Sequence, residues 1–317
     1  MIRWGIIGCG DVTEVKSGPA FNEAPNSKLV AVMRRNGALA EDYARRHGVP
    51  HWYDQADALL DHPGINAIYI ATPPDSHETY ALAAIRRGLP VYIEKPVALN
   101  ALSANRIADA VSNSAVKAVV AHYRRRLPAF LFVKQLLAEG RIGRVNSVSL
   151  RLFKSSPQQN NGWRLNPAIS GGGYFHDLAP HQLDILLDYF GPPLAADGLP
   201  GGADLRIPAT VSGQARFEGD ILFTGEWNFS AQHPDEQDEC LISGSEGSIR
   251  FHFFRHFDKV TLHRGERAEY FSFENPIHIQ APMIAATVKY FLGEGPNPCA
   301  VSEALSGLQL MERFTAY

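Results

Sequence analysis

The sequence predicts an α/β protein in two parts, a doubly wound parallel sheet followed by an α+β domain with a mostly antiparallel sheet. Three observations lead to this prediction. Short apolar runs alternate with helical patterns over the first third of the chain. Strand-like segments joined by short glycine-bearing connections fill much of the second half. At 317 residues the chain is longer than one hydrophobic core usually supports, so we expect two domains, at 1–121 and 122–317.

The N-terminal strands and helices alternate as a parallel sheet requires. Apolar runs predict strands at 2–8, 29–33, 67–72, 91–95 and 118–123. One helix is expected between the first two strands, and further helices at 38–48, 75–88 and 103–114. Gly48 and Gly88 are expected to end two of them, and Asp75 or Ser76 to begin the helix before Gly88. Continuous apolar strands separated by helices indicate a Rossmann-type domain with both faces covered.

The second half predicts helices around an antiparallel sheet. Helical patterns cover 129–143, 281–295 and 302–314. The segment 145–153 alternates like a half-buried strand, and strands with short connections are expected at 209–217, 221–230, 239–245, 248–254 and 259–265. The Gly/Pro-rich segment 191–208 is expected to be a loop within this domain.

A glycine turn, GCGDVT at 8–13, follows the first strand. Gly8 permits a tight turn, and Gly10 lets the backbone approach a pyrophosphate. The N–H groups at the start of the next helix, at Asp11 and Val12, would then meet the phosphates. Thr13 stands where a third glycine is usual, which predicts a looser helix–strand fit or a hydroxyl that faces the cofactor. Cys9 is expected to be a small filler, and the turn as a whole predicts a dinucleotide site.

The end of the second strand, MRRN at 33–36, contains no carboxylate to bond the ribose 2′-hydroxyl of NAD. Arg34 and Arg35 could instead hold a 2′-phosphate through charge-assisted hydrogen bonds. The sequence therefore favours NADP over NAD. Two solvated arginines in a loop are the alternative interpretation.

Composition narrows the function classes. A formal net charge of -3 gives no electrostatic case for nucleic-acid binding. The 3 cysteines fit neither a disulfide framework nor a zinc pattern, which favours a reducing cytoplasm. The apolar run at the N-terminus is too short for a signal peptide, and no apolar stretch approaches the ~18 residues of a membrane span.

Four motifs follow one another along the chain: ATPPDSH at 71–77, EKP at 94–96, GWR at 162–164 and GGGYFHDLAPHQLD at 171–184. Their order resembles the Gfo/Idh/MocA family of NAD(P)-dependent oxidoreductases, which includes glucose–fructose oxidoreductase and inositol dehydrogenase. The resemblance covers almost the whole chain. It implies a large open sheet in the C-terminal domain that joins subunits into a homodimer or homotetramer. It also implies hydride transfer with sugars, cyclitols and related polyols or carbonyl compounds.

The resemblance brings Lys95, Asp177 and His181 to the nicotinamide and the reacting carbon. His181 is suited to be the general acid/base near neutral pH, since imidazole can both give and take a proton there. The Lys95 ammonium could stabilise a developing alkoxide and relay a proton, and Asp177 could orient the imidazole. Along the cofactor we expect Thr72, Pro73, His77, Glu94 and Lys95. For His77, a place at the N-terminus of a helix without a cofactor contact is the alternative.

Substrate contacts are expected from two aromatic–arginine pairs, because an aromatic face and a guanidinium suit a polyol or a sugar acid. Tyr123 and Arg124 open the second domain, and Trp163 and Arg164 precede the glycine run. Structural roles for all four are an equal alternative.

Other interpretations of the same residues remain. Lys95 could be a solvated strand end, and Asp177 and His181 the polar edge of a helix. A metal site would use His176, Asp177, His181 and Asp184, but adjacent side chains on a helix point about 100 degrees apart and converge poorly, so no metal is expected. Asp184 is then expected to be structural or to support the residues of the site, and His176 has no assigned role. A non-catalytic dinucleotide-binding regulator is the alternative function, against which the intact Lys95, Asp177 and His181 argue.

Overall fold

The computed structural model describes residues 1–155 and 162–316 and divides the chain into two compact units. The first unit consists of Met1–Tyr123 together with Pro276–Leu305. The second consists of Arg124–Asn275 and the C-terminal residues from Ser306. One unit holds a parallel sheet and the other a mostly antiparallel sheet, which confirms the predicted fold class.

The sheet of the first unit is parallel throughout and has the strand order β3-β2-β1-β4-β5-β6 among the described residues. Its strands are β1 (Ile2–Ile7), β2 (Ser27–Met33), β3 (His51–Tyr53), β4 (Ala67–Ile70), β5 (Val91–Ile93) and β6 (Ala118–Val120). This is the order of the dinucleotide-binding doubly wound fold, in which ligands bind at the carboxyl ends of the strands.

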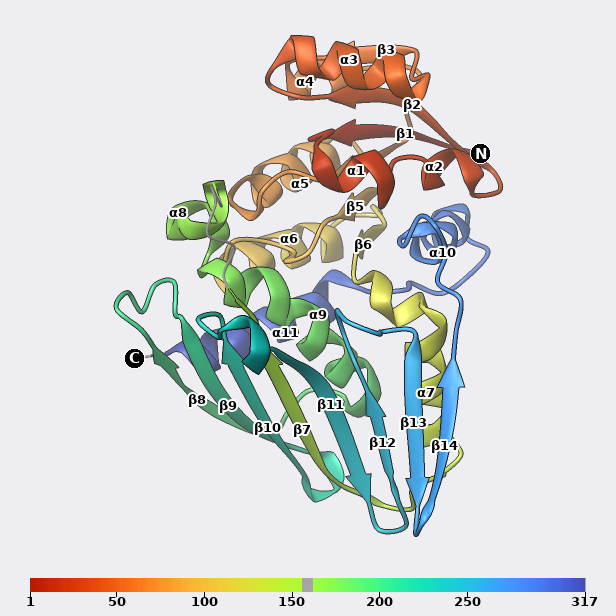
Figure 1. Ribbon diagram of the computed structural model, residues 1–317. Helices are drawn as coiled ribbons and strands as arrows, with labels where there is room; N and C mark the ends of the chain where they lie inside the picture. Colours follow the sequence, from red (N-terminus) through yellow and green to blue (C-terminus); the bar gives the residue numbers. More distant parts are fainter. Residues whose placement is uncertain (156–161, 317) are drawn as a thin grey trace. The chain divides into compact units, whose positions relative to one another are not determined.

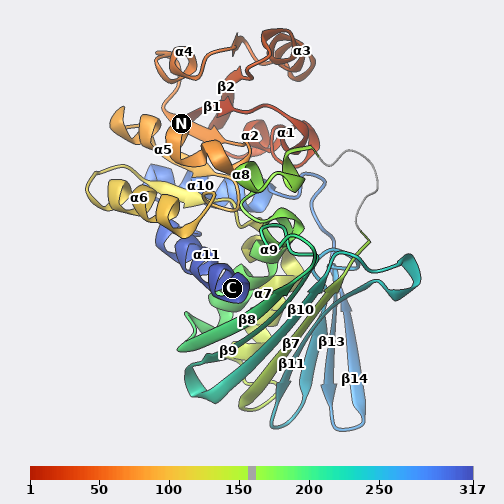
Figure 2. The ribbon, with the colours of Figure 1, turned by 90° about the vertical axis from the view of Figure 1, so that its left-hand side faces the viewer.

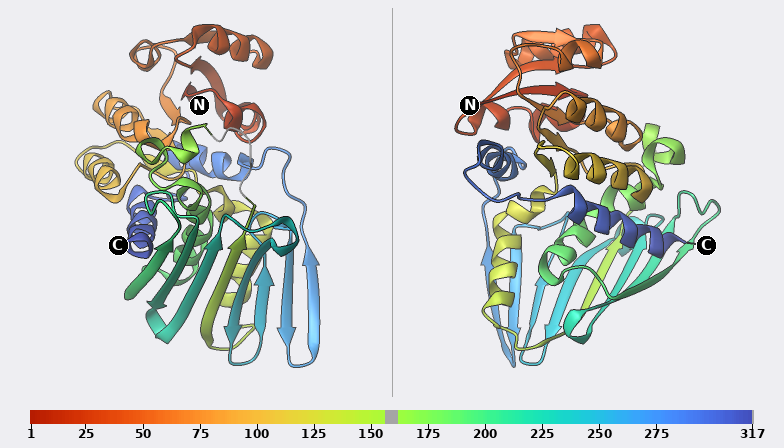
Figure 3. Two further views of the ribbon diagram at one scale, coloured as in Figure 1. Left: turned by 60° about the vertical axis from the view of Figure 1, so that its left-hand side comes forward. Right: turned by 180° about the vertical axis from the view of Figure 1, so that it is seen from behind.

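Helices cover both faces of this sheet. Figures 1 and 3 show α5 and α6 on one face, and α10 on the other, where it contacts α2 and β1. The helices are α1 (Asp11–Val15), α2 (Ala20–Glu23), α3 (Gly37–His47), α4 (Ala56–Leu60), α5 (His77–Arg86), α6 (Ala101–Ser112) and α10 (Ala281–Leu292).

The prediction of one helix between the first two strands is wrong, because the chain breaks into α1 and α2 at Gly18 and Pro19. A side chain at Gly18 would lie 2.2 Å from the Thr13 carbonyl oxygen and 2.3 Å from the Tyr43 hydroxyl. Only glycine therefore fits at this bend, and proline cannot continue a hydrogen-bonded helix through it.

The core of the first unit includes residues from the end of the chain. Trp4 is fully buried, and its ring centroid lies 4.9 Å from that of Phe21 and 5.5 Å from that of Phe291 in α10. The predicted division at 121/122 differs from this grouping in two respects, since the first segment ends at Tyr123 and a later segment belongs to the first unit. Pro276–Leu305 packs within the first unit because α10 supplies apolar side chains to its sheet.

The sheet of the second unit has the order β14-β13-β12-β11-β7-β10-β9-β8 among the described residues (Figure 2). The β10–β7 pair is parallel, and the other described pairs are antiparallel. The strands are β7 (Val145–Phe153), β8 (Ala195–Gly201), β9 (Thr210–Phe217), β10 (Ile221–Asn228), β11 (Gln237–Gly244), β12 (Ser248–Phe251), β13 (Lys259–Arg264) and β14 (Arg267–Ser272).

Among the described residues, helices pack on one face of this second sheet and leave the other face open (Figure 2). Side chains along β9 alternate between exposed and buried positions. On the buried face, Phe314 at the end of α11 stacks 6.1 Å from Phe223, while Leu222 on the other face is 56% exposed. The helices of this unit are α7 (Pro128–Ala138), α8 (Pro167–Ser170), α9 (Gly173–Phe190) and the end of α11 (Val301–Thr315).

The expectation of a loop at 191–208 is wrong, because β8 lies within it at the edge of the sheet. Proline is tolerated on an edge strand, where one side of the backbone needs no partner, and Pro200 stands there. Ala, Gly and Pro carry too little side chain to show the alternation that marks a strand.

No helix in the described part of the chain combines the length and the apolar character needed to cross a membrane.

Candidate functional site

The glycine turn after β1 is shaped by a close approach to the end of β4. Gly8 has φ +96, and a Cβ there would lie 2.7 Å from Thr72 Cγ2 and 2.9 Å from the Ala71 carbonyl carbon. A Cβ at Gly10 would meet nothing closer than the Gly8 oxygen at 4.0 Å. Glycine is therefore required at the first position for packing, and the second leaves the backbone open. This cradle fits the approach of a dinucleotide pyrophosphate.

Thr13 and Cys9 face into the protein. The Thr13 hydroxyl donates to the Gly10 carbonyl at 2.7 Å, and its own carbonyl accepts from the Tyr43 hydroxyl at 2.9 Å. The hydroxyl thus holds the turn from inside. Burial raises the pKa of the Cys9 thiol to about 11, although the nearby Arg34 acts in the opposite direction. The thiol stays protonated at neutral pH, as expected for a small filler.

The end of β2 lies beside this turn. Arg34 Nη1 lies 3.5 Å from the Cys9 carbonyl oxygen, so the guanidinium reaches the glycine turn. Arg35 is exposed. Asn36 caps α3 by accepting from the Leu39 N–H at 3.2 Å. A positive group and a capping amide therefore stand where NAD sites usually present a carboxylate.

Buried hydrogen bonds hold the segment that carries Lys95 at the end of β5. Glu94 is 6% exposed, and its Oε1 accepts from the Tyr69 hydroxyl at 2.6 Å and from Gln280 Nε2 at 2.7 Å. Its Oε2 accepts from the Lys95 backbone N–H at 3.1 Å. Burial, followed by the charge of Glu94, raises the pKa of Tyr69 well above its usual value, so the phenol remains a donor. Glu94 therefore acts within the protein and fixes the backbone of Lys95.

The loop after β4 carries Thr72, Pro73 and His77. Ser76 Oγ lies 2.8 Å from Thr72 Oγ1 and 3.0 Å from the Pro73 carbonyl oxygen, which braces the loop. His77 is 0% exposed, and its ring nitrogens face the carbonyl oxygens of Thr72 at 2.7 Å and Pro96 at 2.9 Å. The structure thus brings this loop and the EKP segment together through His77.

In the second unit, α9 carries Asp177 and His181 one turn apart on one face. Gly173 near its start has φ +67, and a Cβ there would lie 3.2 Å from the Ile207 side chain. Asp177 Oδ2 accepts from Arg164 Nε at 2.8 Å, and the Arg164 guanidinium stacks 4.7 Å from the Trp163 ring centroid. The GWR motif and α9 are therefore joined.

His181 is buried, and its ring lies edge-on to Phe254 with 5.9 Å between centroids. The Arg124 guanidinium also lies over the Phe254 ring, with its carbon 4.8 Å from the ring centroid. Two of its nitrogens donate to the Phe253 carbonyl at 3.1 Å and 2.8 Å. Tyr123 is 9% exposed at the end of the first unit. Phe254 is thus a shared neighbour of Arg124 and His181.

Three further polar residues of α9 are buried, His176, Gln182 and Asp184. Asp184 accepts from Arg125 Nη2 at 2.7 Å and from Arg125 Nε at 2.9 Å, and both side chains are almost fully buried. This pair agrees with the structural role expected for Asp184. Burial lowers the pKa of His176 to about 4, so its ring is neutral near pH 7.

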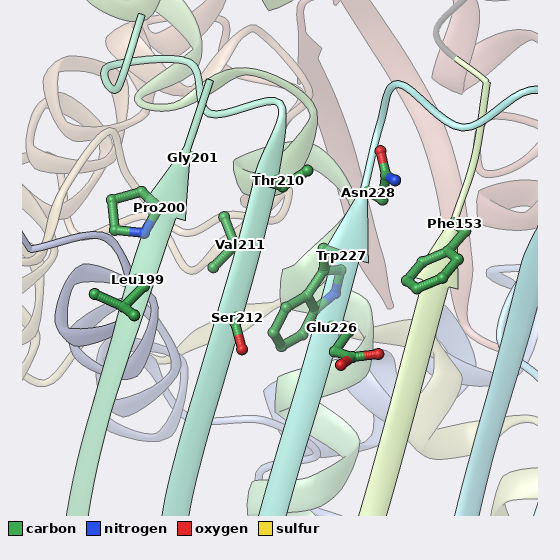
Figure 4. Close-up of a pocket in the computed structure, with 10 residues that line it drawn as sticks. All are labelled: Phe153, Leu199, Pro200, Gly201, Thr210, Val211, Ser212, Glu226, Trp227 and Asn228. Atoms are coloured by element: carbon green, nitrogen blue, oxygen red, sulfur yellow. The ribbon is translucent and has the colours of Figure 1, made fainter. Parts of the chain in front are cut away.

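Within the described ranges, no group of three or more His, Cys, Asp or Glu side chains is arranged to hold a metal ion. A hollow of about 370 Å³ lies elsewhere, on the open face of the second sheet (Figure 4). It is lined by Phe153, Leu199, Pro200, Gly201, Thr210, Val211, Ser212, Glu226, Trp227 and Asn228, and it contains no residue predicted to bind or react.

Several residues that shape these sites were not predicted from the sequence. Tyr69 is a polar residue inside an apolar strand, a weak signal for a buried hydrogen bond. Gln280 and Phe254 are far along the chain from the residues they contact, and no local pattern marks them.

The sequence matches known families over most of its length. Residues 2–122 match the oxidoreductase family with an NAD-binding Rossmann fold, and residues 130–250 match the GFO/IDH/MocA C-terminal domain. Oxidoreductase P35 of Formosa agariphila is 46% identical over 321 residues, which cover 99% of this chain and 98% of that protein. The 1,5-anhydro-D-fructose reductase of Ensifer adhaerens is 28% identical, covering 78% of this chain and 75% of that protein.

Solved structures share the fold. Levoglucosan dehydrogenase in complex with NADH and levoglucosan superposes with a TM-score of 0.89 at 21% identity, covering 99% of this chain and 96% of that one. The likeness extends over both units, and the family match extends over both halves of the sequence. The protein is therefore an oxidoreductase that belongs to the Gfo/Idh/MocA family.

Proposed function

We propose that this protein is an NADP-linked dehydrogenase or reductase of a sugar, a cyclitol or a related polyol or carbonyl compound. The observation that carries the proposal is the arrangement at the carboxyl ends of the parallel strands of the first unit. The open glycine turn follows β1, Arg34 follows the neighbouring β2, and Lys95 follows β5. Dinucleotides bind to this edge of such sheets.

The preference for NADP rests on Arg34 and Arg35. The Arg34 guanidinium lies beside the glycine turn, and no carboxylate occupies positions 33–36 to repel a 2′-phosphate. A guanidinium can bind a phosphate with two parallel hydrogen bonds. The other residues proposed to hold the cofactor are Gly8, Gly10, Asp11, Val12, Thr72, Pro73, His77, Glu94 and Lys95, of which Glu94 and His77 would act by holding the loops.

The proposed substrate class rests on relatives as well as on side chains. Besides the anhydrofructose reductase, levoglucosan dehydrogenase of Pseudarthrobacter phenanthrenivorans is 27% identical, covering 77% of this chain and 70% of that protein. Their names describe action on 1,5-anhydro-D-fructose and on levoglucosan. Trp163 offers an aromatic face stacked on a guanidinium, a combination that suits a ring with several hydroxyl groups. Tyr123, Arg124 and Arg164 are the other proposed substrate residues.

The proposed reaction roles follow from the chemistry of three residues. A bound nicotinamide would supply or accept the hydride. Lys95, whose backbone is held by Glu94, would present its ammonium to the substrate oxygen and stabilise negative charge there. His181 would exchange the proton of that hydroxyl. Asp177, one turn earlier on the same helix face and bonded to Arg164, would orient the imidazole.

Dinucleotide titration tests the proposal first. NADPH and NADH are each titrated into the protein and followed by their fluorescence, and NADPH should bind more tightly. A panel of anhydro sugars, aldoses, ketoses and cyclitols is then screened for NADPH oxidation and NADP reduction. When a substrate from the panel is turned over by the wild-type protein, Lys95→Ala and His181→Ala should each lose most of kcat with it. Binding of neither dinucleotide would refute the cofactor assignment, and unchanged rates in both variants would refute the roles. Dinucleotide binding without turnover would favour the regulator.

We also propose that the open face of the second sheet joins subunits into a homodimer or homotetramer. Large apolar side chains are exposed on it, with Leu199 74% and Leu222 56% accessible. Leu199 also lines the hollow of Figure 4, whose other lining residues include Phe153 of β7. A cytoplasmic location is proposed because Cys9, Cys240 and Cys299 are buried free thiols.

A further inference from the structure

One buried side chain joins the two loops proposed to carry Thr72 and Lys95. His77, the first residue of α5, directs Nε2 to the Thr72 carbonyl at 2.7 Å and Nδ1 to the Pro96 carbonyl at 2.9 Å. Its side chain is 0% exposed, so water does not take the place of either contact. Pro96 follows Lys95 directly. The contact between His77 and the Pro96 carbonyl therefore restrains the backbone next to Lys95.

The ring chemistry limits how this link can form. A neutral imidazole has one N–H and donates to one carbonyl, whereas a protonated ring donates to both. Burial lowers the pKa of His77, while the two carbonyls and the Glu94 carboxylate act in the opposite direction. A protonated ring therefore bonds both loops, whereas a neutral ring bonds one loop and turns its unprotonated nitrogen toward the carbonyl of the other.

The Lys95 backbone is also held from its other side. Its N–H donates to Glu94 Oε2 at 3.1 Å, and the second oxygen of that carboxylate is fixed by Tyr69 and Gln280. Buried side chains thus hold the peptide group before Lys95 and the peptide group that follows Pro96. The side chain of Lys95 therefore projects from a backbone whose position is set within the protein.

We propose that His77 is a positioning residue, which sets the Lys95 backbone against the Thr72 loop through the Pro96 and Thr72 carbonyls. This inference rests on the proposed function, since it takes Lys95 as the residue that meets the substrate oxygen. His77 would then place a reacting group, in addition to supporting the cofactor site.

Three substitutions separate the two contacts. The amide nitrogen of His77→Asn can take the place of Nδ1 and keep the bond to Pro96, whereas that of His77→Gln can take the place of Nε2 and keep the bond to Thr72. His77→Phe keeps the ring and loses both bonds. Ile85→Val, also in α5 and buried, is the matched control because its apolar side chain forms no hydrogen bond with either carbonyl.

We expect His77→Phe to lose about 100-fold in kcat at saturating NADPH, the cost of misplacing a reacting group by about 1 Å. His77→Asn should recover most of kcat but bind NADPH more weakly, and His77→Gln should show the reverse. Ile85→Val should lower the melting temperature and leave the dissociation constant and kcat unchanged. In the wild-type protein, a His77 ring proton protected from solvent exchange should appear by NMR, a measurement that does not depend on the variants folding.

The inference fails if the three His77 variants stay within about twofold of wild type. It also fails if Asn and Gln behave like Phe, or if the His77 ring protons of the wild type exchange freely. These outcomes differ from failure of the proposed function, which would appear as absent dinucleotide binding in the wild type or as full activity in Lys95→Ala.

Discussion

Removing the charge of Asp184 is expected to destabilise the second unit strongly. It removes none of the side chains proposed to take part in the reaction. Asp184 and Arg125 are 4% and 5% exposed and share hydrogen bonds of 2.7 Å and 2.9 Å. Asp184→Asn keeps the shape of the side chain but leaves the guanidinium with an amide in place of its carboxylate. A buried charge that loses its partner is costly because it has neither water nor a counter-charge.

The size of the loss follows from what remains near Arg125. Breaking a buried ion pair by removing one partner costs about 3–5 kcal/mol. Here Asp188 stays 3.9 Å from Arg125 Nη1, so we expect the lower end, about 3 kcal/mol. For a domain of this size that corresponds to a fall in Tm of about 6–12 °C.

The assay is urea unfolding followed by circular dichroism, with thermal melts as a second measurement. Glu246→Gln is the control, because its pair with Arg264 is exposed (60% and 47%) and should contribute less than about 1 kcal/mol. The double substitution Arg125→Met with Asp184→Leu should restore most of the lost stability, since it removes both charges. A loss below about 1 kcal/mol in Asp184→Asn would refute the reasoning.

Three other outcomes are expected. Arg34→Asp should weaken NADPH binding about 10- to 100-fold, the value of a hydrogen bond to a charged group, and affect NADH less; equal effects on both would exclude Arg34 as the 2′ contact. His176 is neutral in the folded protein with a pKa of about 4, so the unfolded chain takes up a proton first as pH falls below about 6.5. The unfolding free energy should therefore decrease by up to about 3 kcal/mol as the pH falls from 6.5 to 4. The His176→Gln variant should lose this pH dependence, and a variant of the exposed His233 should keep it. Leu222→Arg should lower the mass measured by sedimentation, whereas Leu102→Arg, at a site 66% exposed in α6, should not; no change with Leu222→Arg would remove the open face as the interface.

The regular elements were predictable where side chains carry a clear period. The alternation in β7 and the glycine that ends α3 are local signals, and both appear as predicted. β3 and α4 gave no such signal, because the first has three residues on a sheet edge and the second has five. Tertiary pairing, which the local sequence does not display, stabilises elements this short.

The candidate site was predictable as a set of residues but not as a set of contacts. Motif order identified Asp177 and Arg164, yet nothing in the sequence pairs them, and the structure joins them at 2.8 Å. Glu94 and Gln280 are 186 positions apart, and the amide of Gln280 carries no mark of its destination. The Arg164–Asp177 contact depends on how its segments pack within the second unit, and the Glu94–Gln280 contact on the return of the chain to the first sheet.

The return of Pro276–Leu305 to the first unit has a consequence for biosynthesis. When a ribosome has completed residues 1–123, it has not yet made Phe291, which covers Trp4, or Gln280, which binds Glu94. At the usual rate of translation these residues follow roughly ten to thirty seconds later. Until then the nascent N-terminal sheet bears apolar surface and a buried carboxylate without its full set of partners. A chain truncated before α10 should therefore be recognised by chaperones as unfinished, even though every strand of its parallel sheet is present.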